Sequence, residues 1–406
     1  LPQFVVSGKG AHIYCQDGKK YLDWICALGA NLLGYGDYFF NAALVEQIHQ
    51  GVSFSLPTKL EMETARLLVE IVGIRVPGWS PKDLQVRFTK TGSECTMAAV
   101  RLARAVTGRD LLLRCSDSYL GWGDYAIATT PPALGIPKKY AQDTILFKYG
   151  QEPETFLEEY RSPSPIAYPY HAVDTLDLAH KPAAVILEQG LVEPPEGWYE
   201  RLRLWCNKQK CLLILDETAS GFRYAPGGAA EYWGIEPDLV TYGKALGNGL
   251  PISALVGRRE YMEWFGKQSP VFVSGTFCGE TLGLVAARHV LHRIEMGKVN
   301  DHLWLIGNAL IEGLTSVFKN TPYKMLGHGV RSIIVWPDRQ HHAFFIRGMA
   351  KRGILMNRPN YTTCAHTLED VKETVDAVWD IVTELKDRGL PKYKEDQLPR
   401  VLFANR

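Results

Sequence analysis

Short apolar runs alternate with longer amphipathic segments along most of the chain. The runs are bounded by Gly, Pro or charged residues and lie at 86–89, 111–114, 183–188, 212–215, 239–242 and 254–256. Runs of this length are too short for typical helices and are typical of strands that are buried on both faces of a sheet. The segment 58–72 instead places Leu60, Leu67 and Ile71 on one face, which predicts an amphipathic helix.

The carboxyl-terminal part repeats this alternation on a smaller scale. Helical periodicity and strand-like apolar runs alternate there, with helices predicted at 281–296, 302–318, 343–352 and 368–385 and strands at 333–336 and 354–356. Near the amino terminus, residues 10–23 alternate around Asp17-Gly18, which predicts a β-hairpin. The pattern therefore predicts an α/β protein with one large core and a smaller α/β part.

Composition narrows the class of protein. The chain has 406 residues, of which 46% are hydrophobic and 22% charged, and its formal net charge is +1. This balance is typical of a soluble globular protein without a general attraction to nucleic acid or membranes. No apolar stretch approaches the roughly 18 to 20 residues of a transmembrane helix, and the first residues lack a signal-peptide pattern, so we expect a cytoplasmic protein. The eight Cys residues lack C-x-x-C spacing, and no metal site is expected.

A carboxylate and an amine follow two of the central apolar runs. The run at 212–215 ends in Asp216, and the run at 239–242 leads into Gly243 and Lys244. The carboxyl ends of strands are where open α/β sheets bind ligands. A Lys amine in an apolar site can attack a carbonyl, and a buried Asp needs a cationic partner, so the pair suits pyridoxal 5′-phosphate (PLP). Taken alone, the pair is also explained by a surface Lys in a Gly turn and an Asp that caps a helix.

Longer motifs surround this pair. Residues 216–223 read DETASGFR and residues 242–251 read YGKALGNGLP, while residues 88–107 read FTKTGSECTMAAVRLARAVT and residues 274–287 read SGTFCGETLGLVAA. In order and spacing, these motifs resemble the class III PLP-dependent aminotransferases of fold type I. The resemblance covers nearly the whole chain and is closest to the glutamate-1-semialdehyde aminomutase-like branch.

The resemblance implies a fold and a domain organisation. It implies an α/β fold of the fold type I PLP-dependent transferases, with a mostly parallel seven-stranded sheet sandwiched by helices in a large domain and a smaller α/β domain beside it. Residues 1–57 would contribute to the small domain and the active-site mouth, residues 58–297 would form the large PLP-binding domain, and residues 298–406 would form the small domain. The family also uses a homodimer with shared active sites.

The resemblance assigns the catalytic roles to Lys244 and Asp216. Lys244 would form an aldimine with PLP and then shuttle a proton, and Asp216 would hold the pyridinium proton. Gly92 and Ser93 open a predicted helix, whose free N–H groups suit a phosphate, although Ser93 is equally suited to be a helix N-cap. Thr276, in the GT motif, would reach the phosphate bound by a neighbouring subunit.

Four other positions are assigned in the same way. Tyr119 would stack on the pyridine ring. Glu188 would lie near the cofactor, although it could also cap a helix. Thr218 stands where the family usually has a Val packed on the ring, and Leu120 replaces the family's His. Arg358 lies where relatives place substrate-recognising side chains and could grip a carboxylate, although an exposed loop Arg is an ordinary alternative.

Together these features lead to a functional hypothesis. The chain is expected to be a PLP-dependent aminotransferase that moves an amino group between an amino donor and a carbonyl acceptor, with pyridoxamine 5′-phosphate as the intermediate cofactor form. A 1,2-aminomutase of the glutamate-1-semialdehyde type, a racemase or a decarboxylase could use the same residues. A more distant alternative is a PLP-binding module without catalysis. The sequence does not specify the amino donor or the acceptor.

Overall fold

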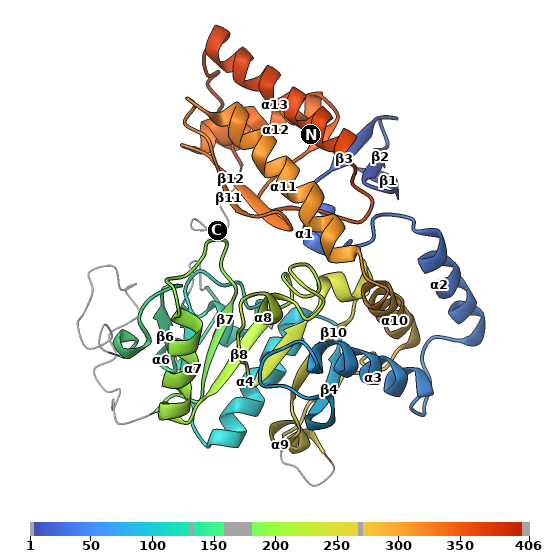
Figure 1. Cartoon of the computed structure of the whole chain (residues 1–406), viewed down its shortest axis with the longest axis vertical. Coiled ribbons are helices and arrows are strands. Elements are labelled where there is room, and N and C mark those ends of the chain that lie inside the picture. Colours follow the sequence, from blue (N-terminus) through green and yellow to red (C-terminus); the bar gives the residue numbers. More distant parts are fainter. Residues whose placement is uncertain (1–3, 130–133, 138, 158–180, 267–270, 400–406) are drawn as a thin grey trace. The chain divides into compact units, whose positions relative to one another are not determined.

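The chain folds into two compact units, as seen in a computed structural model that describes residues 4–129, 134–137, 139–157, 181–266 and 271–399. One unit comprises Gln47–Leu291, and the other combines Leu1–Glu46 with His292–Arg406. We call them the sheet unit and the terminal unit (Figure 1). In the described part of the chain, no helix is both long and apolar enough to cross a membrane.

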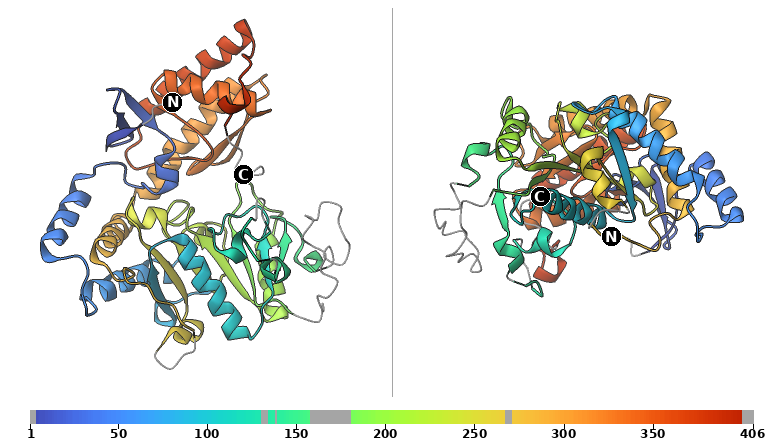
Figure 2. Two further views of the ribbon diagram at one scale, coloured as in Figure 1. Left: turned by 180° about the vertical axis from the view of Figure 1, so that it is seen from behind. Right: turned by 90° about the horizontal axis from the view of Figure 1, so that it is seen from below.

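The sheet unit is built on one seven-stranded sheet flanked by helices (Figures 1 and 2). Its strands follow the spatial order β4, β10, β9, β8, β7, β5, β6, and their bounds are β4 Leu84–Thr89, β5 Leu112–Cys115, β6 Thr144–Phe147, β7 Ala184–Glu188, β8 Leu212–Glu217, β9 Leu239–Tyr242 and β10 Ser253–Arg258. The pairs from β6 to β9 are parallel, and β10 is antiparallel to both of its neighbours. The predicted mostly parallel, seven-stranded sheet is confirmed.

Helices of the sheet unit fill the connections between these strands. They are α3 Lys59–Gly73, α4 Gly92–Thr107, α5 Asp124–Ile127, α6 Lys139–Gln142, α7 Trp198–Gln209, α8 Ala229–Tyr232 and α9 Arg259–Met262, with short 3-10 turns at Pro81–Asp83, Pro153–Thr155, Lys244–Gly247 and Glu263–Phe265. Every residue of β7, β8 and β9 is buried, as expected for central strands covered on both faces. The predicted amphipathic helix is α3, which buries Leu67, Leu68 and Ile71.

Helix α4 is the one that matters most for the site. It packs against β9 and β10, and the small side chains of Ala98, Ala99 and Ala103 on its buried face allow a close approach. Thr91 caps its amino end in a capping box with Glu94, and Gly108 ends it in the left-handed conformation. The alternative interpretation of Ser93 as the N-cap is therefore wrong, and its hydroxyl is not used for capping.

The terminal unit joins both ends of the chain around its own apolar core. It contains the sheet β1 Val5–Lys9, β2 His12–Cys15, β3 Lys20–Asp23 and β13 Ile354–Leu355, and the sheet β11 Lys324–His328, β12 Arg331–Val335 and β14 Asn360–Tyr361. Its helices are α1 Cys26–Gly29, α11 Val299–Phe318, α12 Arg339–Lys351 and α13 Leu368–Arg388, with a 3-10 turn at Glu395–Gln397, and α2 Tyr38–Gln50 and α10 Thr281–Glu295 run across the boundaries between the units. The predicted hairpin is the antiparallel pair β2 and β3.

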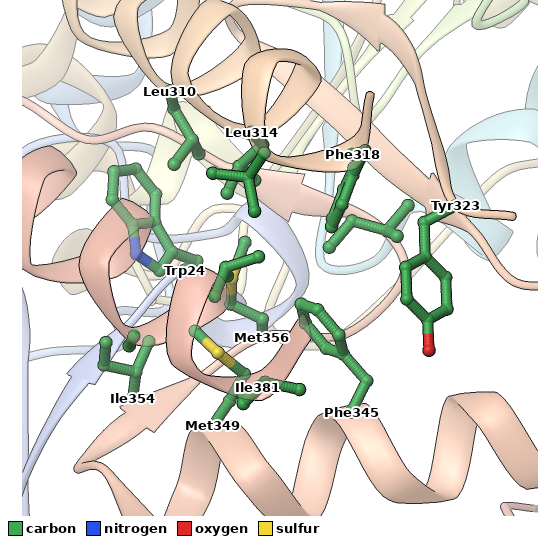
Figure 3. Packing of buried hydrophobic residues seen from close by; sticks show 14 of the residues in the cluster. Trp24, Leu310, Leu314, Phe318, Tyr323, Phe345, Met349, Ile354, Met356 and Ile381 are labelled. Atoms are coloured by element: carbon green, nitrogen blue, oxygen red, sulfur yellow. The ribbon is translucent and has the colours of Figure 1, made fainter. Parts of the chain in front are cut away.

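The core of the terminal unit draws on distant parts of the sequence. Trp24 follows β3, and it packs with residues of α11, α12 and α13 such as Leu314, Phe345 and Ile381 (Figure 3). The indole N–H of Trp24 donates a hydrogen bond of 2.9 Å to Thr374 of α13. The amino-terminal segment therefore completes a core that is otherwise made by the last part of the chain.

Removal of one aromatic side chain tests this core. Phe345 is fully buried, whereas Phe39, in the same unit, is 68% exposed. F345A should lower the free energy of unfolding by about 3 to 5 kcal/mol because it removes buried apolar contacts and leaves a cavity. F39A should change it by less than about 0.5 kcal/mol. Urea unfolding followed by circular dichroism measures both, and equal effects would contradict the described packing.

Candidate active site

The site lies at one end of the central strands of the sheet unit. A cavity of about 310 Å³ opens there. Its lining residues come from the start of α4, the loop after β5, the ends of β7 and β8, and the segment after β9, and they are Lys90, Thr91, Gly92, Ser93, Tyr119, Gly121, Glu188, Asp216, Thr218, Ala219, Lys244, Leu250, Pro251, Ile252 and Ser253. The structure thus brings together seven of the predicted site residues: Gly92, Ser93, Tyr119, Glu188, Asp216, Thr218 and Lys244.

Strand register places the acid at the centre of this group. Asp216 pairs with Glu188 of β7 on one side and with Thr241 of β9 on the other. Residues directly opposite in neighbouring strands point to the same face of the sheet. Asp216 therefore has a second carboxylate on one side and a hydroxyl on the other.

Asp216 is buried but only partly satisfied by the protein. It is 3% exposed, and its Oδ1 accepts hydrogen bonds from the N–H of Thr218 at 2.9 Å and from the hydroxyl of Thr241 at 2.7 Å. Burial, and next the charge of Glu188, raise the pKa of Asp216 to about 6. A cation in the cavity would offset both effects, and the second oxygen, Oδ2, remains for it.

Lys244 follows β9 after a single glycine. Its φ of 40° lies in the left-handed region, which costs a residue with a side chain about 1 kcal/mol. Such a conformation persists only where the surrounding structure holds it, and it is frequent at functional sites. Gly243 allows close packing here, because a Cβ at this position would lie 2.8 Å from the hydroxyl of Ser253 and 3.1 Å from the methyl of Thr218.

The first turn of α4 offers donors to an anion. Among the described residues, no acceptor is recorded for the N–H groups of Gly92 and Ser93, as expected for the first turn of a helix. Gly121 has a φ of +86°, and a Cβ there would lie 2.4 Å from the Ser93 hydroxyl oxygen. Gly92 is equally constrained, because its Cβ would meet the Thr218 methyl at 2.8 Å. These glycines allow the close packing around the turn, and the free N–H groups at a helix start suit a small anionic group.

Two further residues border the same cavity. The N–H of Tyr119 donates a hydrogen bond of 3.2 Å to the Glu188 carboxylate, and the Tyr119 side chain is 37% exposed. The Thr218 hydroxyl is buried and has no hydrogen-bond partner among the described residues. The proposed stacking of Tyr119 and the packing of Thr218 on a ring stay predictions.

Two of the predicted residues lie outside this cavity. Thr276 is exposed, in a turn between β10 and α10 of the sheet unit. Arg358 belongs to the terminal unit, where its Nε–H donates to the Ile334 carbonyl oxygen at 2.8 Å and its guanidinium lies 5.8 Å from the Trp336 ring centroid. Burial lowers the pKa of Arg358. Both assignments, to a neighbouring subunit's phosphate and to a substrate, stay predictions.

Other residues of the site were not identified from the sequence. Thr241 could have been noticed as a polar residue within an otherwise apolar run, but its contact with Asp216 depends on strand order. Nothing in the residues around Lys90 indicates a role for it, because its ammonium contacts Pro251 and Glu280, which lie far away in the sequence. Among the described residues, no group of three or more metal-ligating side chains is present.

Comparison with known proteins defines the family. The sequence model of the aminotransferase class-III family matches residues 1–381, and the chain belongs to that family. It is 31% identical to the glutamate-1-semialdehyde 2,1-aminomutase of Methanothermobacter thermautotrophicus, with 95% of this chain and 93% of the relative covered.

Solved structures agree with this assignment. The FumI protein of Sphingopyxis sp. MTA144, in its PLP internal aldimine form, superposes with a TM-score of 0.81 at 26% identity, covering 95% of this chain and 90% of that one. An omega-transaminase from Sphaerobacter thermophilus gives a TM-score of 0.80 at 25% identity, covering 94% and 91%. The predicted family, the fold type I architecture and the class of PLP-dependent enzymes are confirmed.

The pKa of Asp216 gives a test that needs no cofactor. The folded-state pKa of about 6 lies above the ordinary value of 3.8, so the native state holds this proton more tightly than the unfolded chain. The Asp216 contribution to stability is therefore present at low pH and is lost as pH rises from about 4 to about 6, by about 2 to 3 kcal/mol. D216N keeps an oxygen for Thr218 and Thr241 and removes this dependence.

Urea unfolding of the cofactor-free wild type and of D216N, at intervals between pH 4 and pH 7, measures this contribution. The stability difference between the two proteins should shift in favour of D216N as pH rises through this window. A difference that stays constant from pH 4 to pH 7 would show that Asp216 titrates normally.

Proposed function

We propose that the protein is a PLP-dependent aminotransferase that moves an amino group from an amino donor to a carbonyl acceptor. The proposal is carried by one observation: Asp216 and Lys244, at the ends of neighbouring parallel strands, line one cavity together with the anion-binding turn at Gly92 and Ser93. The cavity thus offers an acid, an amine and a set of N–H donors to a single ligand. We also retain the assignment of 58–297 as the PLP-binding domain, with 1–57 and 298–406 forming the small domain.

The residues present fit PLP. Bound PLP supplies an aldehyde that can link to an amine and an electron-withdrawing ring that stabilises negative charge at the reacting carbon. The N–H groups of Gly92 and Ser93 and the Ser93 hydroxyl bind its phosphate. The carboxylate of Asp216 would keep the ring nitrogen protonated, and that cation would in turn offset the effect of burial that raises the pKa of Asp216.

Lys244 performs the steps that the chain itself contributes. Its Nζ would bind the cofactor aldehyde until a substrate amine displaces it, and the freed amine would then take a proton from the substrate carbon and give it to another carbon. Leu250, Pro251 and Ile252 add apolar walls beside it, which limit water around the reacting atoms. Tyr119 and Thr218 border the space between the turn and Asp216 and so restrict the plane of a bound ring.

An aminomutase is a second candidate, favoured by the curated relatives. Four glutamate-1-semialdehyde 2,1-aminomutases are 29 to 32% identical to this chain over nearly its whole length. An aminomutase and an aminotransferase use the same residues to move a proton, and they differ in whether the carbonyl product leaves. Of the two departures from the family pattern, Thr218 lines the cavity, and Leu120 is fully buried between the lining residues Tyr119 and Gly121.

Analysis of products from one turnover separates the two reactions. The PLP-loaded protein is incubated with single amines and no acceptor, and products are resolved by chromatography. An aminotransferase releases up to one carbonyl product per site and stops, whereas an aminomutase releases an isomer of its substrate and continues. Isomer formation without a carbonyl product would contradict the proposal. K244A should lower the rate at least about a hundredfold, because the proton carrier is missing. K208A, on the exposed face of α7, should leave the rate unchanged.

A homodimer with shared sites is part of the proposal. If Thr276 serves the partner's site, a mixed dimer of K244A and T276A chains contains one site with both residues intact and one site with both changed. Random pairing of equal amounts makes about half of the dimers mixed, so refolding the two variants together should restore about one tight PLP site per four chains. Equilibrium dialysis counts the tight PLP sites per chain. If the mixture has only the average number of its two parents, Thr276 does not contribute to the partner's site.

A further inference from the structure

The first three residues of α4, Gly92, Ser93 and Glu94, include no positive charge. Gly92 and Ser93 offer neutral N–H groups, and the nearest charged side chain in the turn is Glu94. Its carboxylate accepts hydrogen bonds from the N–H groups of Lys90 and Thr91, so it is held beside the turn. A phosphate with about two negative charges therefore binds next to a carboxylate, and a nearby cation would be needed to balance the charge.

Lys90 is placed to provide this cation. Its side chain is only 14% exposed and lines the same cavity as the turn. Among the described residues that line this cavity, the Lys and Arg side chains are those of Lys90 and Lys244, and Lys244 is already assigned to the aldehyde. An ammonium group has three N–H donors. One is directed to the Pro251 carbonyl oxygen at 2.9 Å and one to Glu280, which leaves the third for a ligand.

The position of this ammonium group is fixed by its surroundings. Glu280 accepts hydrogen bonds of 2.8 Å from the N–H groups of both Leu282 and Gly283 at the start of α10, so the carboxylate that holds Lys90 cannot turn away. A Cβ on Gly283 would lie 2.6 Å from Glu280 Oε1 and 2.9 Å from Lys90 Nζ. The charge is therefore held in place before any ligand binds, which reduces the entropic cost of using it.

We infer that Lys90 is a further binding residue for the phosphate of the cofactor, with Glu280 as the residue that positions it. The inference rests on the proposed function, because it names a contact within the same site. The competing role for the pair is structural: Lys90 and Glu280 connect the turn before α4 to the segment that carries Thr276. The two roles make opposite predictions for Glu280. If Lys90 binds the phosphate, neutralising Glu280 should maintain or strengthen PLP binding, because less of the Lys90 charge is offset. If the ion pair is structural, neutralising Glu280 should weaken PLP binding as much as removing Lys90 does.

Binding of PLP and of pyridoxal to the cofactor-free protein tests this assignment, because pyridoxal has the same ring and aldehyde but no phosphate. K90M should weaken PLP binding about ten- to hundredfold, the cost of one charge-assisted hydrogen bond, and should leave pyridoxal binding within about threefold. K90R keeps the charge and should bind PLP within about fivefold of the wild type. E280Q keeps a side-chain oxygen that can accept from Lys90 and removes the negative charge, so it should bind PLP as tightly as the wild type or more tightly. K208M, on the exposed face of α7, is the matched control.

The midpoint temperature of thermal unfolding of each variant shows whether it is folded. Inorganic phosphate should compete with PLP for the wild-type site more strongly than for the K90M site. The inference is overturned if K90M weakens PLP and pyridoxal equally, if E280Q weakens PLP as much as K90M does, or if K90M binds PLP like the wild type. The double variant K90M/E280Q, which leaves no unpaired buried charge, should repeat the phosphate-specific loss. A wild-type protein that binds no PLP would instead overturn the proposed function itself.

Discussion

The parallel pairing of β7, β8 and β9 is the constraint on which the site depends. It sets Glu188, Asp216 and Thr241 side by side at one level of the sheet. Because these strands are buried throughout, the two carboxylates are shielded from water, which disfavours their charged forms. The pKa of Asp216 therefore rises to about 6. The same pairing brings Lys244, the second residue after β9, to the same cavity. A cationic ligand ring would offset the cost of burying these two carboxylates side by side.

Charge also organises the opposite side of the cavity. The first turn of α4 presents N–H groups and a hydroxyl, while Glu94 closes its capping box and Lys90 is held by Glu280. A ligand with an anionic group at one end and a basic ring nitrogen at the other matches both sides at once. The residues of the two sides come from separate connections of one sheet, as is usual for ligand sites at the carboxyl ends of parallel strands.

Much of this arrangement could be predicted from the sequence, because it follows from local pattern. The apolar runs predict the central strands, and Asp216 and Lys244 are recognisable because they lie within two residues of the ends of two runs. Contacts between distant segments could not be found in the same way: Lys90 and Glu280 are 190 residues apart, and Thr241 meets Asp216 only through strand order. At the start of α4, Thr91 and Ser93 are both suitable caps by type, and only the backbone geometry decides for Thr91. The roles of Thr276 and Arg358 depend on a second subunit and on a substrate, which one sequence does not contain.

The central claim is that Lys244 holds the cofactor in the cavity that Asp216 lines. Chemical reduction of the PLP-loaded protein with borohydride makes the link between an amine and the cofactor permanent, and peptide mass spectrometry then identifies the modified residue. The account predicts one cofactor per chain, attached to the peptide that contains Lys244. Attachment to Lys90 or to any other lysine, or no attachment at all, would contradict it.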